Sequence, residues 1–256
     1  MGLLEDLKSI FYSRKLTCSV CRRENFSDRT VCDECFATLP FNGESICGHC
    51  GRATPYPAEY CDYCKNKESF IDLDRSVYDY EQPIKGLIHR FKYDGEKYLA
   101  EEFALEMNKI FTKSMGFADC VAFVPSTDKK LKERGYNQSR VLAEEFSKLT
   151  EIPLIDAVQK IKETESQVGL SVKERKENLK GCFKVVEKAE VKGKTVLIVD
   201  DVMTTGSTLE TLAEKLKKAG AIKVLALTVA SVSFNKNKGE EQGEKSPKTE
   251  KMNENL

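Results

Sequence analysis

Two adjacent aspartates, Asp200 and Asp201, follow an unbroken aliphatic run, Val196–Val199, and precede a loop rich in threonine, glycine and serine. Such a run is typical of a strand that is buried on both faces, as in a parallel sheet. The loop leads into an amphipathic helical pattern, where Ser207 and Glu210 have the spacing of a capping box. Neighbouring carboxylates accept hydrogen bonds from two sugar hydroxyls, and backbone amides at a helix N-terminus bind phosphate. The stretch therefore predicts a site for a phosphorylated sugar.

Three other polar sites are excluded because the stretch lacks the residues that they require. A Walker loop needs a lysine before its last hydroxyl residue, and a dinucleotide fingerprint needs three spaced glycines where only Gly206 is present. A receiver domain needs an aspartate at a later strand end, but no aspartate follows Asp201. An acid pair that only caps a helix does not account for the strand, the loop and the helix together. We expect ribose hydroxyls on the two carboxylates and the 5-phosphate on Thr204, Thr205, Gly206, Ser207 and Thr208.

The cysteines form an internal repeat. Two quartets share the spacing C-x2-C-x10-C-x2-C, and the second is the first shifted by 29 residues. Such quartets are typical of closed, four-thiolate structural zinc sites, whereas redox C-x-x-C pairs usually occur singly. Filling each quartet separately closes the shorter loops, although the spacing leaves an interleaved arrangement open. We expect two structural zinc ions on Cys18, Cys21, Cys32, Cys35, Cys47, Cys50, Cys61 and Cys64.

Composition and charge exclude some classes of partner. The chain has 256 residues, and 41 basic residues balance 41 acidic ones, so no overall field favours nucleic acid or a membrane surface. No apolar run reaches transmembrane length, and the first residues lack an export signal. We therefore expect a cytoplasmic protein without stable membrane insertion.

Strands and helices alternate along the central part of the chain. Strand patterns at 73–80 and 120–125 are each followed by helical patterns, and 221–234 reads as a closing strand. This order predicts an α/β fold with a parallel sheet and helices on both faces. The expected domains are a double zinc ribbon over 1–66, a sheet domain over 70–234, and a disordered tail over 235–256.

The acid pair and its loop resemble the phosphoribosyl-pyrophosphate motif of type I phosphoribosyltransferases. The segments "IHRFKYDGEKYLAEEF", "RGYNQSRVLAEEF" and "ESQVGLSVKERKENLKGCF", together with the tandem cysteine quartets, resemble the ComF family of competence-associated proteins. This resemblance covers nearly the whole chain apart from the tail. It implies a type I phosphoribosyltransferase-like fold and a link to the uptake of single-stranded DNA.

The resemblance also implies further site residues. The segment "VPST", which includes Ser126, lies where these enzymes have a pyrophosphate loop. The negative charge of phosphoribosyl pyrophosphate calls for Mg²⁺ and for basic side chains, which Lys129, Arg134 and Arg175 would supply. Lys92 is a further candidate of the same kind. In catalysis Asp200, Asp201 and Arg134 would orient the ribose, favour its developing positive charge and stabilise the leaving pyrophosphate.

Two functions of different class remain open at this point. One is a phosphoribosyltransferase acting on an acceptor that the residues do not identify. The other is a non-catalytic competence factor that binds single-stranded DNA or a DNA-uptake protein and keeps the sugar-phosphate pocket as a sensor or scaffold. The acid pair and the loop over residues 204–208, which we call the phosphate loop, are intact and favour the enzyme. Zinc ribbons often serve interactions, which favours the binding protein.

Overall fold

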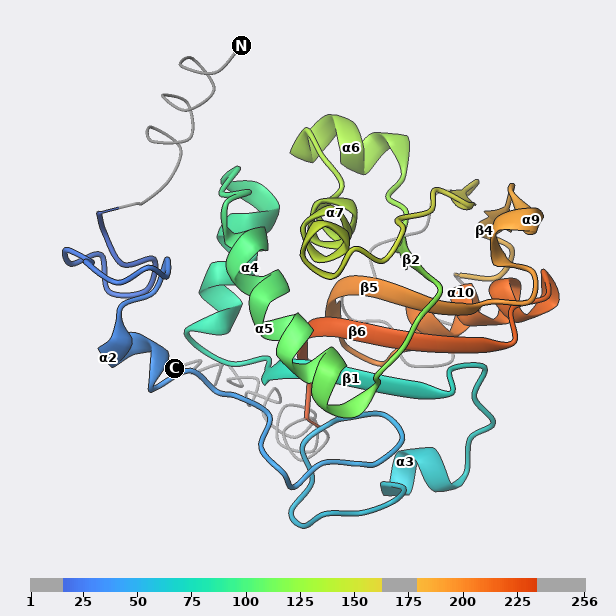
Figure 1. Ribbon diagram of the computed structural model, residues 1–256, viewed down its shortest axis with the longest axis horizontal. Helices are drawn as coiled ribbons and strands as arrows, with labels where there is room; N and C mark the ends of the chain where they lie inside the picture. Colours follow the sequence, from blue (N-terminus) through green and yellow to red (C-terminus); the bar gives the residue numbers. More distant parts are fainter. Residues whose placement is uncertain (1–15, 163–178, 234–256) are drawn as a thin grey trace, which may run out of the picture.

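A four-stranded parallel sheet forms the centre of the molecule (Figure 1), in the computed structural model that describes residues 16–162 and 179–233. The spatial order of its strands is β1-β6-β5-β2, and all three neighbouring pairs are parallel. Their bounds are β1 (Leu73–Asp79), β2 (Cys120–Phe123), β5 (Thr195–Met203) and β6 (Lys223–Ser231).

Helices cover both faces of this sheet, as the sequence predicts. Leu197 and Val199 of β5 belong to the core under the first group of helices, while Val196 and Ile198 pack with Leu212 on the opposite face. The alternation follows from successive side chains pointing to opposite faces of a strand. The helices of one face are α4 (Ile84–Tyr93), α5 (Leu99–Ser114) and α7 (Gln138–Thr150), and that of the other is α10 (Ser207–Lys218).

β5, the strand that carries the acid pair, extends beyond the end of one of its two neighbours. Along β5 the pairing with β6 continues to Met203, whereas the pairing with β2 ends at Val199. Asp200 and Asp201 therefore lie within the strand but beyond the end of β2. One side of β5 is open there to side chains from other elements.

Shorter elements complete the sheet domain. The pattern around residues 156–190 contains a small antiparallel pair that is separate from the main sheet. Arg175 and the predicted tail, 235–256, lie outside the described residues. Within the described part of the chain, no helix combines the length and the apolar character needed to cross a membrane. The remaining elements are α6 (Asp128–Arg134), β3 (Val158–Lys160), β4 (Phe183–Val185) and α9 (Lys188–Val191).

The predicted capping box at the start of α10 is wrong. The N-cap is Gly206, with φ of 77°, and Ser207 is already the first helical residue. Glu210 does not fold back to the helix start, because its carboxylate accepts hydrogen bonds from the hydroxyl of Ser69 and the backbone N–H of Phe70. Two residues far away in the sequence thus donate to Glu210, which the local pattern predicted to cap the helix.

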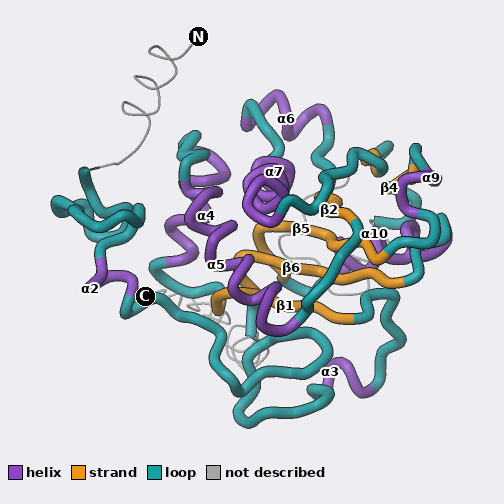
Figure 2. Tube along the Cα trace, in the orientation of Figure 1, coloured by secondary structure: helices purple, strands orange, loops and turns teal. Residues whose placement is uncertain are grey.

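The zinc-ribbon region consists mostly of loops and turns (Figure 2), with the short helices α2 (Asp33–Phe36) and α3 (Asp62–Lys65). We call residues 16–39 the first ribbon and residues 45–66 the second ribbon. The first ribbon lies beside α4 and α5, while the second lies along β1 (Figure 1). A region with so little regular structure needs another source of folding free energy, which a zinc ion at each cysteine quartet would supply.

Candidate functional site

Each aspartate of the acid pair has its own partner from a helix. Ser139, in the first turn of α7, donates its hydroxyl to Oδ1 of Asp200 at 2.6 Å. Lys92, in the last turn of α4, places Nζ 3.0 Å from Oδ1 of Asp201. Asn137 is the N-cap of α7, and its side chain accepts hydrogen bonds from the first turn. Two helix ends therefore converge on the opened side of β5.

Burial shifts the pKa of Asp200 and acts on the lysine that pairs with Asp201. Burial raises the pKa of Asp200 to about 7, and the neighbouring charge of Asp201 adds to this shift. Burial also disfavours the charged form of Lys92, but its attraction to Asp201 outweighs that effect, so the pKa of Lys92 is raised. The site thus holds a charged Lys92–Asp201 pair beside a carboxyl group that titrates near neutral pH.

Two buried polar atoms near the pair have no hydrogen-bond partner among the described residues: Oδ2 of Asp201 and Oη of Tyr136. Asp201 is only 4% exposed, and its charge acts on the hydroxyl of Tyr136. Buried polar atoms are nearly always hydrogen-bonded in native proteins, and leaving one unpaired costs about 1–3 kcal/mol. These atoms therefore mark a place where a polar ligand can bind.

The loop after β5 has the geometry of an anion site. Gly206 adopts a left-handed conformation directly before α10, which a residue with a side chain adopts only with strain. The hydroxyls of Thr205 and Ser207 lie 2.9 Å apart and hydrogen-bond to each other. Thr204 is exposed, and Thr208 is partly exposed in the first turn of α10. The loop and the positive end of this 12-residue helix are thus adjacent to the acid pair.

The predicted pyrophosphate-side residues lie on the segment after β2. Ser126 is half-buried in the wall of a cavity of about 660 Å³, and Lys129 is exposed on α6. Arg134 ends the same helix, where it donates to Oη of Tyr93 at 3.0 Å and stacks on that ring. Among the described residues, no hydrogen bond or ion pair joins these three side chains to the acid pair. The acid pair and the loop after it are thus adjacent, whereas Lys129 and Arg134 lie on α6.

The eight predicted zinc ligands form two separate clusters. Within each quartet all ligand atoms lie within 4.8 Å of one another, and each quartet comes from one ribbon, which confirms sequential rather than interleaved filling. The backbone N–H groups of Cys32 and Cys61 point at the sulfurs of Cys18 and Cys47, at 3.3 and 3.2 Å. Four convergent thiols with N–H donors to sulfur fit a structural zinc ion with no open position.

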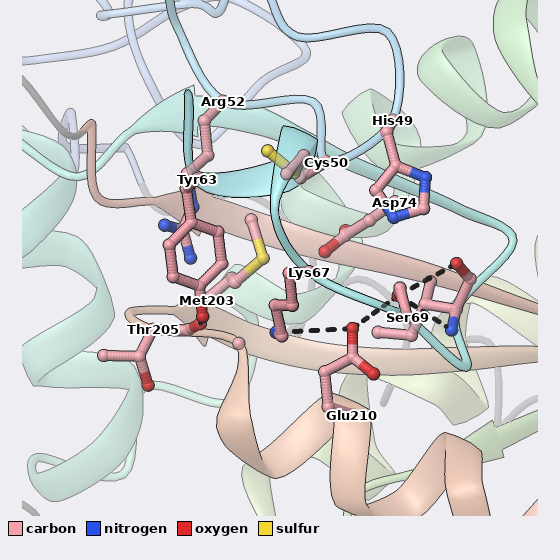
Figure 3. Close-up of a pocket in the computed structure, with 13 residues that line it drawn as sticks. His49, Cys50, Arg52, Tyr63, Lys67, Ser69, Asp74, Met203, Thr205 and Glu210 are labelled. Carbon is pink, nitrogen blue, oxygen red and sulfur yellow. Dashed lines mark hydrogen bonds and ion pairs between the residues drawn. The ribbon is translucent and has the colours of Figure 1, made fainter. Parts of the chain in front are cut away.

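The second ribbon touches the phosphate loop directly (Figure 3). Nη2 of Arg52 donates to the carbonyl oxygen of Thr204. Oη of Tyr63, which Figure 3 shows near Thr205, donates to the carbonyl oxygen of Thr205. Lys67, just beyond the ribbon, is 3.5 Å from Glu210 on the first helical turn after the loop. The second ribbon and the loop after β5 therefore share one packed interface.

Sequence reasoning missed several of these residues. Ser139 and Tyr136 lie inside the segment "RGYNQSR", whose resemblance to a family motif was the available signal. Arg52 and Tyr63 carry no local signal, because their partners lie 152 and 142 residues away.

The parallel sheet with helices on both faces and the two four-cysteine clusters define a protein with a phosphoribosyltransferase-type fold and an N-terminal double zinc ribbon. Two family models agree: the phosphoribosyl transferase domain matches residues 133–254, and the double zinc ribbon domain matches residues 7–65. The chain is 34% identical over 181 residues to competence protein F of Haemophilus influenzae. The aligned region is 68% of this chain and 79% of that protein. It belongs to the ComF family of competence-associated proteins.

Other relatives cover similar shares of the chain. DNA utilization protein YhgH of Escherichia coli K12 is 31% identical over 213 residues, which are 81% of this chain and 86% of that protein. Competence protein ComFC of Bacillus subtilis is 28% identical over 204 residues, covering 75% and 80% respectively. Among solved structures, the glutamine phosphoribosylpyrophosphate amidotransferase from B. subtilis aligns with 55% of this chain and 26% of its own, at 22% identity and a TM-score of 0.35.

Proposed function

We propose that this protein binds phosphoribosyl pyrophosphate together with Mg²⁺ and transfers the phosphoribosyl group to an unidentified acceptor during DNA uptake. The observation that carries the proposal is the buried Oδ2 of Asp201, which has no partner among the described residues and lies next to the loop that begins α10. A ribose hydroxyl would satisfy this acceptor, and the 5-phosphate would then reach the loop. The names of the relatives, which refer to competence and DNA utilization, support the biological setting.

The residues have distinct tasks in this proposal. Asp200 and Asp201 accept hydrogen bonds from the ribose and favour the positive charge that develops on the sugar as pyrophosphate leaves C1. Lys92 holds Asp201 in place through the 3.0 Å ion pair. Arg134 leaves the ring of Tyr93 and pairs with the departing pyrophosphate.

Magnesium fits the same donors. Carboxylate oxygens are ligands that Mg²⁺ prefers, and a carboxylate oxygen has two lone pairs, so Oδ2 of Asp201 can accept from a ribose hydroxyl and also face the ion. Asp200 and Asp201 would hold the ion from the protein side. When bound, the ion neutralises charge on the pyrophosphate.

A second candidate is a non-catalytic competence factor that keeps this pocket as a sensor or scaffold. In its favour, Phe26 on the first ribbon and Tyr56 on the second are 84% and 70% exposed. Exposed aromatic rings can stack on the bases of single-stranded DNA. An acceptor screen that follows pyrophosphate release separates the two candidates, because only the enzyme releases pyrophosphate from the ligand that both bind.

Calorimetry with phosphoribosyl pyrophosphate and Mg²⁺ tests the site itself. Asp200→Asn and Asp201→Asn each replace an acceptor oxygen with an amide donor that faces a donating ribose hydroxyl, so affinity should fall by about ten- to a hundredfold. Thr205→Val should weaken binding of ribose 5-phosphate as well, but not of ribose, because it acts through the phosphate. Thr112→Val, on the exposed side of α5, is the matched control. Equal affinity in all these proteins would show that the motif is not the sugar-phosphate site.

A further inference from the structure

Two carbonyl oxygens of the phosphate loop are held from the side of the second ribbon. Nη2 of Arg52 lies 2.5 Å from the carbonyl oxygen of Thr204, and Oη of Tyr63 lies 3.2 Å from that of Thr205. Arg52 is only 2% exposed, so water does not compete strongly for its donor. Figure 3 shows Arg52 and Tyr63 directed toward the loop near Thr205.

The direction of these carbonyls determines the direction of two amides. In a trans peptide group the C=O and N–H bonds point in opposite directions. Because the carbonyls of Thr204 and Thr205 point at the ribbon, the N–H groups of Thr205 and Gly206 point away from it. These N–H groups lie directly before α10, where the helix dipole favours an anion.

Zinc ligation holds the backbone from which both side chains extend. Arg52 follows Cys50 by two residues, and its carbonyl oxygen accepts a hydrogen bond from the N–H of Cys47 at 2.9 Å. Tyr63 lies between Cys61 and Cys64. Since the ligands come from both sides of the ribbon, the bound ion fixes the two donors relative to each other.

The interface between the second ribbon and the sheet domain is packed rather than open. The cavity enclosed between them is about 30 Å³, which leaves room for about one water molecule and not for a substrate. Gly51 lies so close to β1 that a Cβ there would be 2.7 Å from the carbonyl oxygen of Asp74. Beyond the loop, Glu210 accepts hydrogen bonds from Ser69 and Phe70. A movement of the ribbon is therefore transmitted to the loop.

We propose that the second zinc ribbon positions the phosphate loop, with Arg52 and Tyr63 as positioning residues that turn the amides of Thr205 and Gly206 toward the bound phosphate. The part of this inference that concerns the ligand rests on the proposed function. The part that concerns the loop conformation does not.

The variant Tyr63→Phe removes one hydroxyl donor, and Arg52→Met removes the guanidinium group with its charge; both keep most of the side-chain volume. Tyr56→Phe is the matched control, since this tyrosine is in the same ribbon and 70% exposed. Metal analysis should find the same zinc content in all the variants and the wild type. In amide NMR spectra of the free protein, Tyr63→Phe should shift the signal of Gly206 and Arg52→Met that of Thr205, because each N–H shares a peptide group with the released carbonyl.

Calorimetry on the same proteins then separates the loop from the rest of the site. Ribose 5-phosphate, which needs the loop, should bind about three- to tenfold more weakly to Tyr63→Phe and to Arg52→Met than to the wild type. Magnesium pyrophosphate, which does not need the loop, should bind all four proteins equally. A purely structural role of the two residues would not produce this difference between ligands.

The possible outcomes distinguish the two proposals. Unchanged signals of Thr205 and Gly206 in both variants would overturn the positioning role. Shifted signals with unchanged affinity for ribose 5-phosphate would show that the loop conformation does not serve phosphate binding, which also overturns it. Shifted signals in a protein whose wild type does not bind ribose 5-phosphate would overturn the proposed function and leave the ribbon as the element that sets the loop conformation.

Discussion

The two zinc ribbons share one cysteine spacing but contact different parts of the molecule. In the first ribbon, the backbone N–H of Thr30 donates to Glu102 of α5 at 2.8 Å, and the hydroxyls of Ser19 and Tyr98 lie 3.2 Å apart. In the second ribbon, Arg52 and Tyr63 donate to the loop after β5. The first ribbon is thus anchored to a helical face, and the second to the candidate ligand site.

The two ribbons also differ in how many of their zinc ligands are buried. One ligand cysteine of the first ribbon is buried, whereas three of the second are buried. The repeat therefore encodes two similar metal sites, while the residues between the cysteines decide what each ribbon supports. We infer that the first ribbon can be lost with little effect on sugar-phosphate binding and that the second cannot.

The largest expected effect comes from removing one zinc ligand from each ribbon in turn. Cys32→Ser and Cys61→Ser are matched, because the two positions correspond in the repeat and both are half-buried. Each should lower the zinc content from about two ions to about one per chain, since the loss of a thiolate removes much of the metal-binding free energy. Only Cys61→Ser should also weaken the binding of ribose 5-phosphate, by at least about tenfold. Metal analysis and calorimetry make the measurement, and an equal loss of binding in both variants would contradict the division.

An intermediate effect is expected from Gly51→Ala, which separates the second ribbon from β1 without touching a zinc ligand. The new Cβ would lie 2.7 Å from the carbonyl oxygen of Asp74, and the φ of 65° is strained for alanine. Strain and overpacking together should lower the free energy of unfolding by about 2–4 kcal/mol. Gly43→Ala is the control, because a Cβ there meets no atom within 4 Å. Denaturant unfolding of both variants decides the point, and similar stabilities would mean that the close approach at Gly51 does not matter.

The smallest expected effect concerns Asp200, a residue that the second ribbon does not contact through the described hydrogen bonds. Asp200 is held by Ser139 of α7 rather than by a ribbon, and its pKa is raised to about 7. The folded state then binds more protons than the unfolded state between about pH 4 and 7, so this group lowers stability as the pH rises through that range. The stability of Asp200→Asn relative to wild type should increase by roughly 1 kcal/mol per pH unit across the range.

Unfolding of both proteins at several pH values measures this difference. It should be the same in a Tyr63→Phe background, because Tyr63 contacts the loop and not Asp200. A difference that does not vary with pH would contradict the raised pKa. A difference that disappears with Tyr63→Phe would show that the second ribbon also controls the acid pair.

Much of the fold followed from patterns that are local in the chain. Strand and helical patterns identified β1, β2, β5 and β6 and the helices between them, because the strands of a parallel sheet are buried on both faces and each helix buries one stripe of side chains. The capping box failed for the opposite reason. Glu210 has the right spacing from Ser207, but Ser69 and Phe70 offer it better donors once the chain has folded.

The sequence by itself determined the two zinc sites, the parallel α/β sheet and the adjacency of the acid pair to its loop, and the phosphoribosyltransferase-type fold was implied by its resemblance to a known family. Cysteine spacing and hydrophobic periodicity act over a few residues, so they can be read without knowing the packing. Only the tertiary structure decided that Lys92 and Ser139 bind the two aspartates. The same holds for the hydrogen bonds from Arg52 and Tyr63 to the loop. The hydrogen bonds among these contacts join residues that are 61 to 152 positions apart in the sequence. Such pairings depend on how whole elements dock, and no local spacing encodes the docking.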